Sequence, residues 1–184
     1  ERIESMRPYA DRMLELMAGT GRASASVRGL PLLQRREVGS VAIVPVTGDR
    51  GLAGAFNAQI LRRASALSRE LQAQNVQVRW LPVGRKGTAS LRFRRLELAG
   101  SWTGFSDKPA YADAQGIAHS LAEAYVNGEV DRVVIVYNAF VSALVQKVTV
   151  RDVLPIPQDL LEQAEEAEQD AMGHTPDFIY EPEP

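Results

Sequence analysis

The sequence predicts an α/β domain, and three stretches of the chain support that prediction. Residues 130–137 are nearly all apolar and β-branched, as is typical of a parallel strand that helices bury on both faces. Residues 38–47 form a second apolar run, which leads directly into a glycine-rich turn and a helical pattern. Residues 145–151 alternate between apolar and polar side chains, which indicates a half-exposed strand at a sheet edge.

The predicted strands follow one another in the order expected of a three-layer, Rossmann-like domain. Three parallel strands begin near Val38, Val76 and Val130, and crossover helices pack onto both faces of the sheet. A fourth strand begins near Val145, after a turn at residues 139–142, and should be antiparallel. The sheet is therefore expected to be mainly parallel, with an antiparallel edge strand.

Two crossover helices are predicted between these strands. The first follows the glycine-rich turn and has apolar residues at helical spacing, namely Ile60, Ala64, Leu67 and Leu71. The second should begin at residues 106–109, with Asp107 as its cap, and end at Gly128. Its apolar residues are Ala114, Ile117, Ala118, Leu121 and Tyr125. The second strand should span residues 76–83, and residues 84–87 should form a turn after it.

The first residues of the chain predict part of a coiled-coil helix. Apolar side chains alternate at spacings of three and four, at Ile3, Met6, Ala10, Met13 and Met17, and Tyr9 widens the stripe. An amphipathic helix packed on its own domain has the same pattern, so these residues alone leave both interpretations open. Because the chain opens in mid-helix and without an initiator methionine, we expect a fragment of a longer chain.

Four segments are predicted from these patterns. They are the end of an N-terminal helix (residues 1–20), a linker (21–37), the α/β domain (38–157) and an acidic connector (158–184). The connector has six acidic residues and no basic ones between Asp159 and Asp170. Such a run is typical of a solvated segment.

The composition excludes several classes of function. A net charge of −2 over 184 residues predicts no general affinity for nucleic acid or anionic lipid, so the basic stretch at residues 85–95 is interpreted as a solvated helix face. The chain has no cysteine, only His119 and His174 as histidines, and no metal or nucleophile motif. No apolar run is long enough to span a membrane. We therefore expect no catalytic site, metal, cofactor or direct membrane insertion.

The glycine-rich turn at residues 48–54 leaves a nucleotide-binding site open as an alternative. A helix N-terminus after such a turn can hold phosphate, but glycines at every third position match neither a dinucleotide nor a P-loop motif. The second strand ends in Arg85 and Lys86 rather than in an acidic partner for a ribose, although a basic pair could accept a 2′-phosphate. The alternative function is thus a free-standing Rossmann-like nucleotide-binding module.

The same turn resembles the signature of a known family. Residues 47–57 read T-G-D-R-G-L-A-G-A-F-N, and the γ subunits of F-type ATP synthases have T-S-D-R-G-L-C-G-x-x-N at this strand-to-helix junction. Gly48 replaces the usual serine and Ala53 a common cysteine. Further similar stretches are R-P-Y-A-D-R-M at residues 7–13, G-R-K-G at 84–87, the pair at 136–141 and 146–150, and F-I-Y-E-P at 178–182.

The resemblance implies a function that the composition alone does not. In that family γ is the central rotor stalk: it transmits rotation of the c-ring to the catalytic subunits of the α3β3 hexamer and binds the ε subunit. It is non-catalytic and holds no nucleotide. The complex lies at an energy-coupling membrane, so a peripheral place on the cytoplasmic face, most simply of a bacterial plasma membrane, is implied.

The resemblance also implies where partner subunits would touch this chain. The turn matches the family loop near the lower end of the β subunits, which makes Asp49, Arg50, Gly51, Leu52, Ala53 and Gly54 interface candidates. The foot of the stalk helix adds Met6, Tyr9 and Met13. From the residues alone, Asp49 and Arg50 could equally cap the turn and the helix after it.

Overall fold

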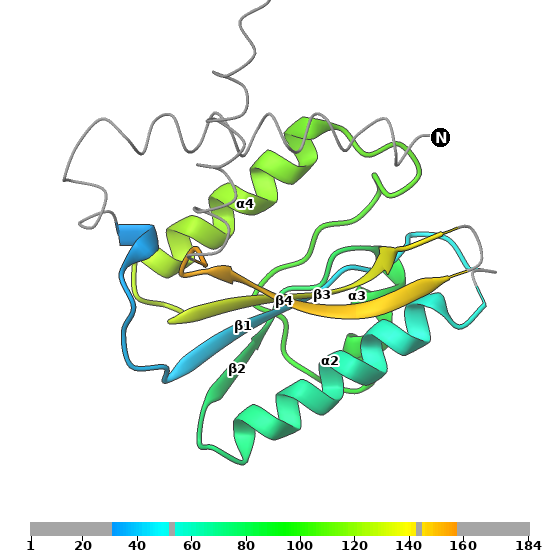
Figure 1. Cartoon of the computed structure of the whole chain (residues 1–184). Helices are drawn as coiled ribbons and strands as arrows, with labels where there is room; N and C mark the ends of the chain where they lie inside the picture. The colour runs from blue at the N-terminus through cyan, green and yellow to red at the C-terminus, as the bar shows by residue number, and fades with distance from the viewer. Residues whose placement is uncertain (1–30, 52–53, 143–144, 158–184) are drawn as a thin grey trace, which may run out of the picture. The chain divides into compact units, whose positions relative to one another are not determined.

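A computed structural model describes residues 31–51, 54–142 and 145–157, and Pro31–Pro155 make up one unit of it (Figure 1). The elements in chain order are η2 (Pro31–Leu33), β1 (Ser40–Pro45), α2 (Phe56–Gln72), β2 (Gln77–Trp80), α3 (Arg85–Phe93), α4 (Tyr111–Val126), β3 (Arg132–Phe140) and β4 (Gln146–Leu154). The predicted N-terminal helix and acidic connector lie outside the described residues, as do Met6, Tyr9, Met13, Leu52 and Ala53.

The four strands form one sheet in the order β2-β1-β3-β4. β1 is parallel to both neighbours, with Ile43 opposite Trp80 of β2 and opposite Val134 of β3. β4 runs antiparallel to β3, with Val150 opposite Val136. The prediction of three parallel strands and one antiparallel edge strand is confirmed.

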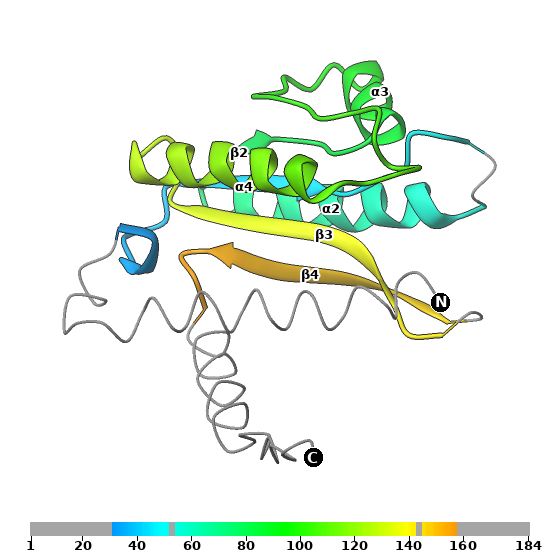
Figure 2. The same cartoon turned by 90° about the horizontal axis from the view of Figure 1, so that it is seen from above.

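Helices cover both faces of this sheet (Figures 1 and 2). α2 lies on one face and α4 on the other, as the right-handed crossovers of a doubly covered sheet require. α3 lies near α2 and contributes Leu91 to the core on that side. The predicted three-layer α/β architecture is therefore confirmed.

The larger core lies between α2 and the sheet. The apolar positions predicted for this helix are buried, and Leu61 joins them. Val41 and Ile43 of β1 face the same core, because side chains alternate along a strand. Burial of each large aliphatic side chain contributes about 1.5–3 kcal/mol, so this layer supplies much of the stability of the domain.

α4 buries fewer side chains against the sheet than α2 does. Of the five apolar residues predicted to face the sheet, only Leu121 and Tyr125 are buried, whereas Ala114 and Ala118 are exposed. The guanidinium of Arg36 lies 4.4 Å from the centre of the Tyr125 ring and makes a 2.7 Å ion pair with Asp131. The C-terminal half of α4 is thus the half that holds this helix to the sheet.

Tyr125 is fixed at both its ring and its hydroxyl group. The hydroxyl donates to the Gln34 carbonyl, and Arg36 donates to the carbonyls of Tyr125 and Val130. Burial raises the pKa of Tyr125 above its usual value; Arg36 opposes this shift and Asp131 adds to it. These contacts attach residues 34–36 to the end of α4.

The second strand, predicted at residues 76–83, is shorter and spans Gln77–Trp80. Two further predicted boundaries, at the starts of α4 and α3, are also wrong. α4 begins at Tyr111, and its N-terminal Ala110 amide donates to Asp113 at 2.8 Å, so Asp107 is not the cap. Residues 85–87 are the first turn of α3 and not a loop. Both errors arise because contacts with residues 47–49 decide the local structure.

Candidate subunit-interface site

The turn after β1 and the turn after β2 lie side by side. Parallel neighbouring strands end at the same edge of a sheet, and here the pairing continues beyond the strands: Val46 pairs with Val83, and the Thr47 amide donates to the Val83 carbonyl at 2.9 Å. The residues that follow the two strands are therefore in direct contact.

Three successive residues of the first turn accept the first three amides of α3. Asp49 Oδ1 accepts from the Arg85 amide at 2.9 Å and the Gly48 carbonyl accepts from the Lys86 amide at 3.1 Å. Thr47 Oγ1 accepts from the Gly87 amide at 2.8 Å. The first amides of a helix have no acceptor within the helix, so the turn after β1 supplies the acceptors for these three amides of α3.

A third segment joins these two at Asp49. Its Oδ2 accepts from the amides of Gly104 and Ser106, both at 2.9 Å, and its own amide donates to the Ser106 hydroxyl at 2.8 Å. We call residues 47–49, with their partners at 85–87, 104 and 106, the corner network. It connects two loops and the first turn of α3, which are far apart in sequence.

The charge of Asp49 is stabilised inside this network. Burial alone would raise the pKa of the carboxyl group, but the amides of Ser106, Gly104 and Arg85 outweigh it and hold the pKa well below its usual range. Asp49 therefore stays ionised throughout the neutral and mildly acidic range. The prediction that Asp49 caps the helix after its own turn is wrong: α2 has no side-chain cap, and Asp49 caps α3 instead.

Thr47 and Gly84 pack without space between them. Thr47 is 3% exposed, and its hydroxyl donates to the Val83 carbonyl at 2.8 Å while it accepts from Gly87. A Cβ at Gly84 would lie 2.1 Å from the Thr47 carbonyl oxygen, and the φ of Gly84 is 91°. No other residue type fits that position.

Arg50 has the opposite placement to Asp49. Its side chain is 82% exposed and pairs at 2.6 Å with Asp107, which is itself 50% exposed. Gly51 is also exposed and close to the side chain of Lys86, and Gly54 has a φ of 53° with open space around it. The structure thus brings Asp49 into the corner network and leaves Arg50 at the surface beside it.

Sequence reasoning missed four residues of this site. Thr47, Gly84, Gly87 and Ser106 make the contacts that hold Asp49 and α3 in place. The spacing of Gly84 and Gly87 directly after a strand was a usable signal, because such glycines allow another backbone to approach. The glycines alone do not indicate that Thr47 is the residue that packs against them.

Metal binding and phosphate binding can be compared with the geometry of this site. In residues 31–51, 54–142 and 145–157, no group of three His, Cys, Asp or Glu side chains could hold a metal ion. The α3 N-terminus cannot bind phosphate through its first three amides, because the chain already occupies them. Of the described helices, none combines the length and the apolar character needed to cross a membrane.

Comparison with known proteins agrees with the motif in the first turn. A family model described as ATP synthase matches residues 1–184. The chain is 42% identical over 179 residues to the ATP synthase gamma chain of Rubrobacter xylanophilus, covering 97% of this chain and 59% of that one. For the gamma chain of Legionella pneumophila the identity is 34% over 183 residues, covering 100% and 61%. The chain thus spans about three fifths of the length of these relatives.

Solved structures share the fold. The central stalk and c-ring of the Tetrahymena thermophila mitochondrial ATP synthase includes a chain that matches with a TM-score of 0.56 at 23% identity, covering all of this chain and 82% of that one. A chain of the Euglena gracilis mitochondrial rotor matches with a TM-score of 0.50 at 20% identity, covering 90% and 64%. Because the family model matches residues 1–184 and the relatives are gamma chains, this chain belongs to the ATP synthase γ-chain family.

Proposed function

We propose that this chain is the globular part of the central rotor stalk of a proton-translocating F-type ATP synthase. In this role it transmits rotation of the c-ring to the catalytic subunits of the α3β3 hexamer and carries out no covalent chemistry itself. The support is membership of the γ-chain family, together with the likeness in fold to rotor chains. The proposed place is peripheral, on the cytoplasmic face of the coupling membrane, with the ε subunit and the c-ring as direct partners.

One observation makes the α/β domain suitable for bearing a load. The corner network joins two loops and the first turn of α3 through hydrogen bonds of 2.8–3.1 Å, so the surface next to it cannot shift without breaking several of them together. Close packing beneath it, with Ile43 and Val134 fully buried, has the low compressibility of protein interiors. A force on this corner would therefore reach the sheet with little local deformation.

The geometry separates the roles of the two charged candidates. All the acceptor atoms of the Asp49 carboxylate face internal amides, so we propose that it positions the turn. Arg50 projects from that turn at the surface, where its ion pair among the described residues is with Asp107. We propose that Arg50 contacts a neighbouring subunit, and that the exposed Gly51 lies within the same contact.

The test introduces Arg50→Ala into the native polypeptide that contains this chain and assembles it with the other subunits in membrane vesicles. ATP-driven proton uptake, divided by ATP hydrolysed, should fall by about twofold or more, while the melting temperature of the domain changes little because Arg50 is exposed. Arg151→Ala, an exposed charge on β4, is the matched control.

Two results would contradict the proposal at different levels. An unchanged coupling ratio in Arg50→Ala would remove this residue from the interface and leave the rotor function intact. Failure of the wild-type polypeptide to assemble with the α, β, ε and c subunits would remove the rotor function itself.

A further inference from the structure

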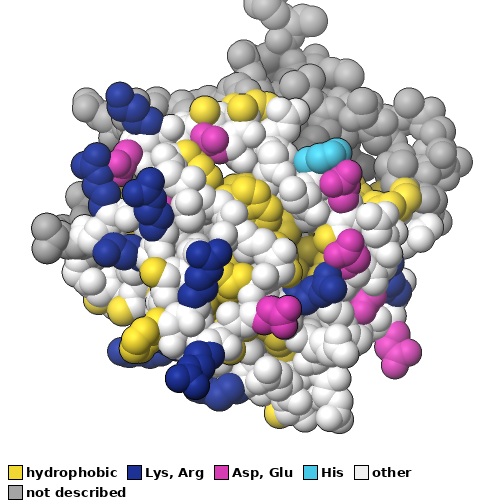
Figure 3. All heavy atoms as spheres, turned by 180° about the vertical axis from the view of Figure 1, so that it is seen from behind, with side chains coloured by type: hydrophobic (Ala, Val, Ile, Leu, Met, Phe, Trp, Pro, Cys, Tyr) yellow, Lys and Arg dark blue, Asp and Glu magenta, His cyan; other side chains and the backbone are white. Residues whose placement is uncertain are grey.

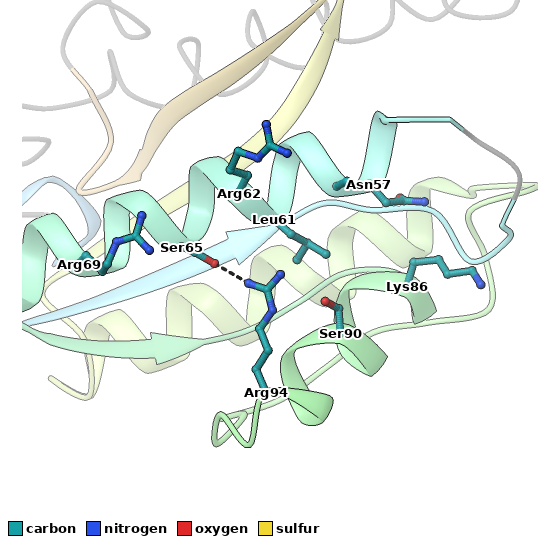
Figure 4. Close-up of a pocket in the computed structure, with 9 residues that line it drawn as sticks. Asn57, Leu61, Arg62, Ser65, Arg69, Lys86, Ser90 and Arg94 are labelled. Atoms are coloured by element: carbon teal, nitrogen blue, oxygen red, sulfur yellow. Dashed lines mark hydrogen bonds between the residues drawn. The ribbon is translucent and has the colours of Figure 1, made fainter.

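A groove of about 480 Å³ lies between α2 and α3 and adjoins the corner network at Lys86 (Figure 4). Its two walls are the helices themselves. Leu61 and Arg69 belong to α2, while Lys86 belongs to α3 and Arg94 follows directly after that helix. Arg94 reaches across and donates to the Ser65 hydroxyl at 3.0 Å, which connects the walls (Figure 4).

The charge of this groove is of one sign. Four of its nine lining residues are basic, namely Arg62, Arg69, Lys86 and Arg94, and none is acidic. None of the four makes an ion pair within the part of the chain that the structure describes. By contrast, Arg36, Arg50, Arg63, Arg79 and Arg132 each have an acidic partner there. Uncompensated cations on both walls attract an anionic ligand.

The net charge of the whole chain conceals this distribution. The described residues contain 16 Lys and Arg against 10 Asp and Glu, although the whole chain has a net charge of −2. Seen from behind, the basic side chains gather on the side where α2 and α3 lie, and most of the acidic ones lie elsewhere (Figure 3). The groove is therefore part of a basic surface that the composition did not predict.

The length and lining of the groove limit what can fill it. The lining residues run along α2 from Asn57 to Arg69, which is about 18 Å at 1.5 Å per residue, far longer than one phosphate group. The floor is apolar, since Ala58 and the buried Leu61 lie between the charged side chains. A flat lipid surface cannot follow a concave floor. An elongated ligand with apolar groups between its negative charges fits both features.

We propose that this groove docks an acidic, amphipathic segment of a partner protein. Carboxylates of the segment would pair with Arg69 and Lys86 on opposite walls, and its apolar side chains would lie against Leu61. Guanidinium groups bind carboxylates through two parallel hydrogen bonds, which gives such a contact direction as well as attraction. Arg50 is not among the residues that line the groove, although Lys86 lies close to Gly51 beside it. The proposal does not depend on the rotor function.

The experiment measures binding of a synthetic probe to the full 184-residue chain. The probe is a fluorescein-labelled helical peptide of about 14 residues, matched to the groove in length, with glutamates and leucines along one face. Its twin has glutamine in place of every glutamate. Fluorescence anisotropy should show binding of the acidic probe, at least tenfold weaker binding of the twin, and weakening as salt rises from about 50 to about 300 mM.

A pair of double variants locates the site. Arg69→Gln with Lys86→Gln removes one cation from each wall, and both side chains are exposed, so folding should be preserved. The probe should then bind about fivefold or more weakly. Lys147→Gln with Arg151→Gln is the control, because it removes one exposed lysine and one exposed arginine from β4. The two double variants therefore have the same net charge as each other. The affinity of the control should stay within twofold of wild type.

Three outcomes would overturn the proposal. Equal weakening in both double variants would mean that binding depends on the net charge of the chain and not on the groove. Equal binding of the glutamine twin would mean that carboxylates are not required. Binding of vesicles that contain anionic lipid, without binding of the acidic probe, would assign the basic surface to a membrane. None of these results bears on coupling in the assembled complex, so the rotor function is tested separately.

Discussion

The glycines after β1 and those after β2 differ in how much space surrounds them, which their sequences do not reveal. The turn after β1 is rich in glycine, yet a Cβ at Gly48 would meet no atom closer than 3.7 Å, and one at Gly51 would meet only the flexible end of Lys86. After β2, a Cβ at Gly84 or Gly87 would collide with Thr47, at 2.1 Å and 2.7 Å. The number of glycines in a turn therefore says little about where glycine is required, because the requirement comes from a neighbouring segment.

The largest expected effect comes from Gly84→Ala. The new methyl group would meet a backbone oxygen, which cannot move aside, and alanine disfavours a φ of 91°. We expect a loss of about 4 kcal/mol or more in the free energy of unfolding, or a chain that does not fold. Urea unfolding followed by circular dichroism measures this.

Gly48→Ala is the matched control in the first turn. Its methyl group would have ordinary contacts, so the loss should be below about 1 kcal/mol. If the two alanine variants were equally stable, the contrast between the turns would be wrong.

Thr47→Val should have the next largest effect. Valine keeps the shape of the side chain but removes the acceptor of the buried Gly87 amide, whereas the Val83 carbonyl still accepts from the backbone of residue 47. One orphaned amide costs about 1–3 kcal/mol. Thr47→Ser keeps the hydroxyl group and should cost less than half as much in the same unfolding assay. Equal losses in the two variants would mean that the hydrogen bond contributes little.

Asp49→Asn should have the smallest effect of the three and the only one that depends on pH. Both carboxylate oxygens accept from backbone amides, whereas asparagine has one acceptor oxygen and an NH2 group that donates, so at least one amide loses its acceptor. The variant should therefore be about 1.5 kcal/mol less stable at pH 7. Because the pKa of Asp49 in the folded state lies below the unfolded value of 3.8, the extra stability of wild type is present above that value. It is lost as the pH falls from about 5 through 3.8 toward the folded-state pKa.

Unfolding in urea at several pH values between 7 and 3 checks this dependence. The difference in free energy between wild type and Asp49→Asn should shrink as the pH falls. Asp107→Asn is the control, since that carboxylate is half exposed and makes a surface ion pair with Arg50. A difference that stayed constant with pH would show that Asp49 does not contribute through its charge.

The sequence predicted those parts of the fold that depend on local pattern. The helical spacing from Ile60 to Leu71 identified α2, and strict alternation identified the edge strand β4 and its antiparallel direction. The start of α4 was wrong by several residues, because Ser106 bonds to Asp49 instead of opening a helix. No local pattern reports a contact between segments 57 residues apart.

The candidate site was predicted in part. The family motif pointed to Asp49 and Arg50 as one charged pair, whereas the structure gives them different surroundings, one inside the corner network and one at the surface. The motif gives the residues of the turn but not the direction of each side chain. The basic groove was missed because the acidic residues outside the described part offset its charge in the composition.

The corner network also bears on the order in which the chain folds. Its bonds join residues 47–49 to residues 85–87 and to Ser106, and they require β1 and β2 to lie in register first. Closing loops of this size costs entropy before any contact repays it. We therefore expect the first turn of α3 to be completed after the parallel strands have paired, so that this helix depends on long-range order for its beginning.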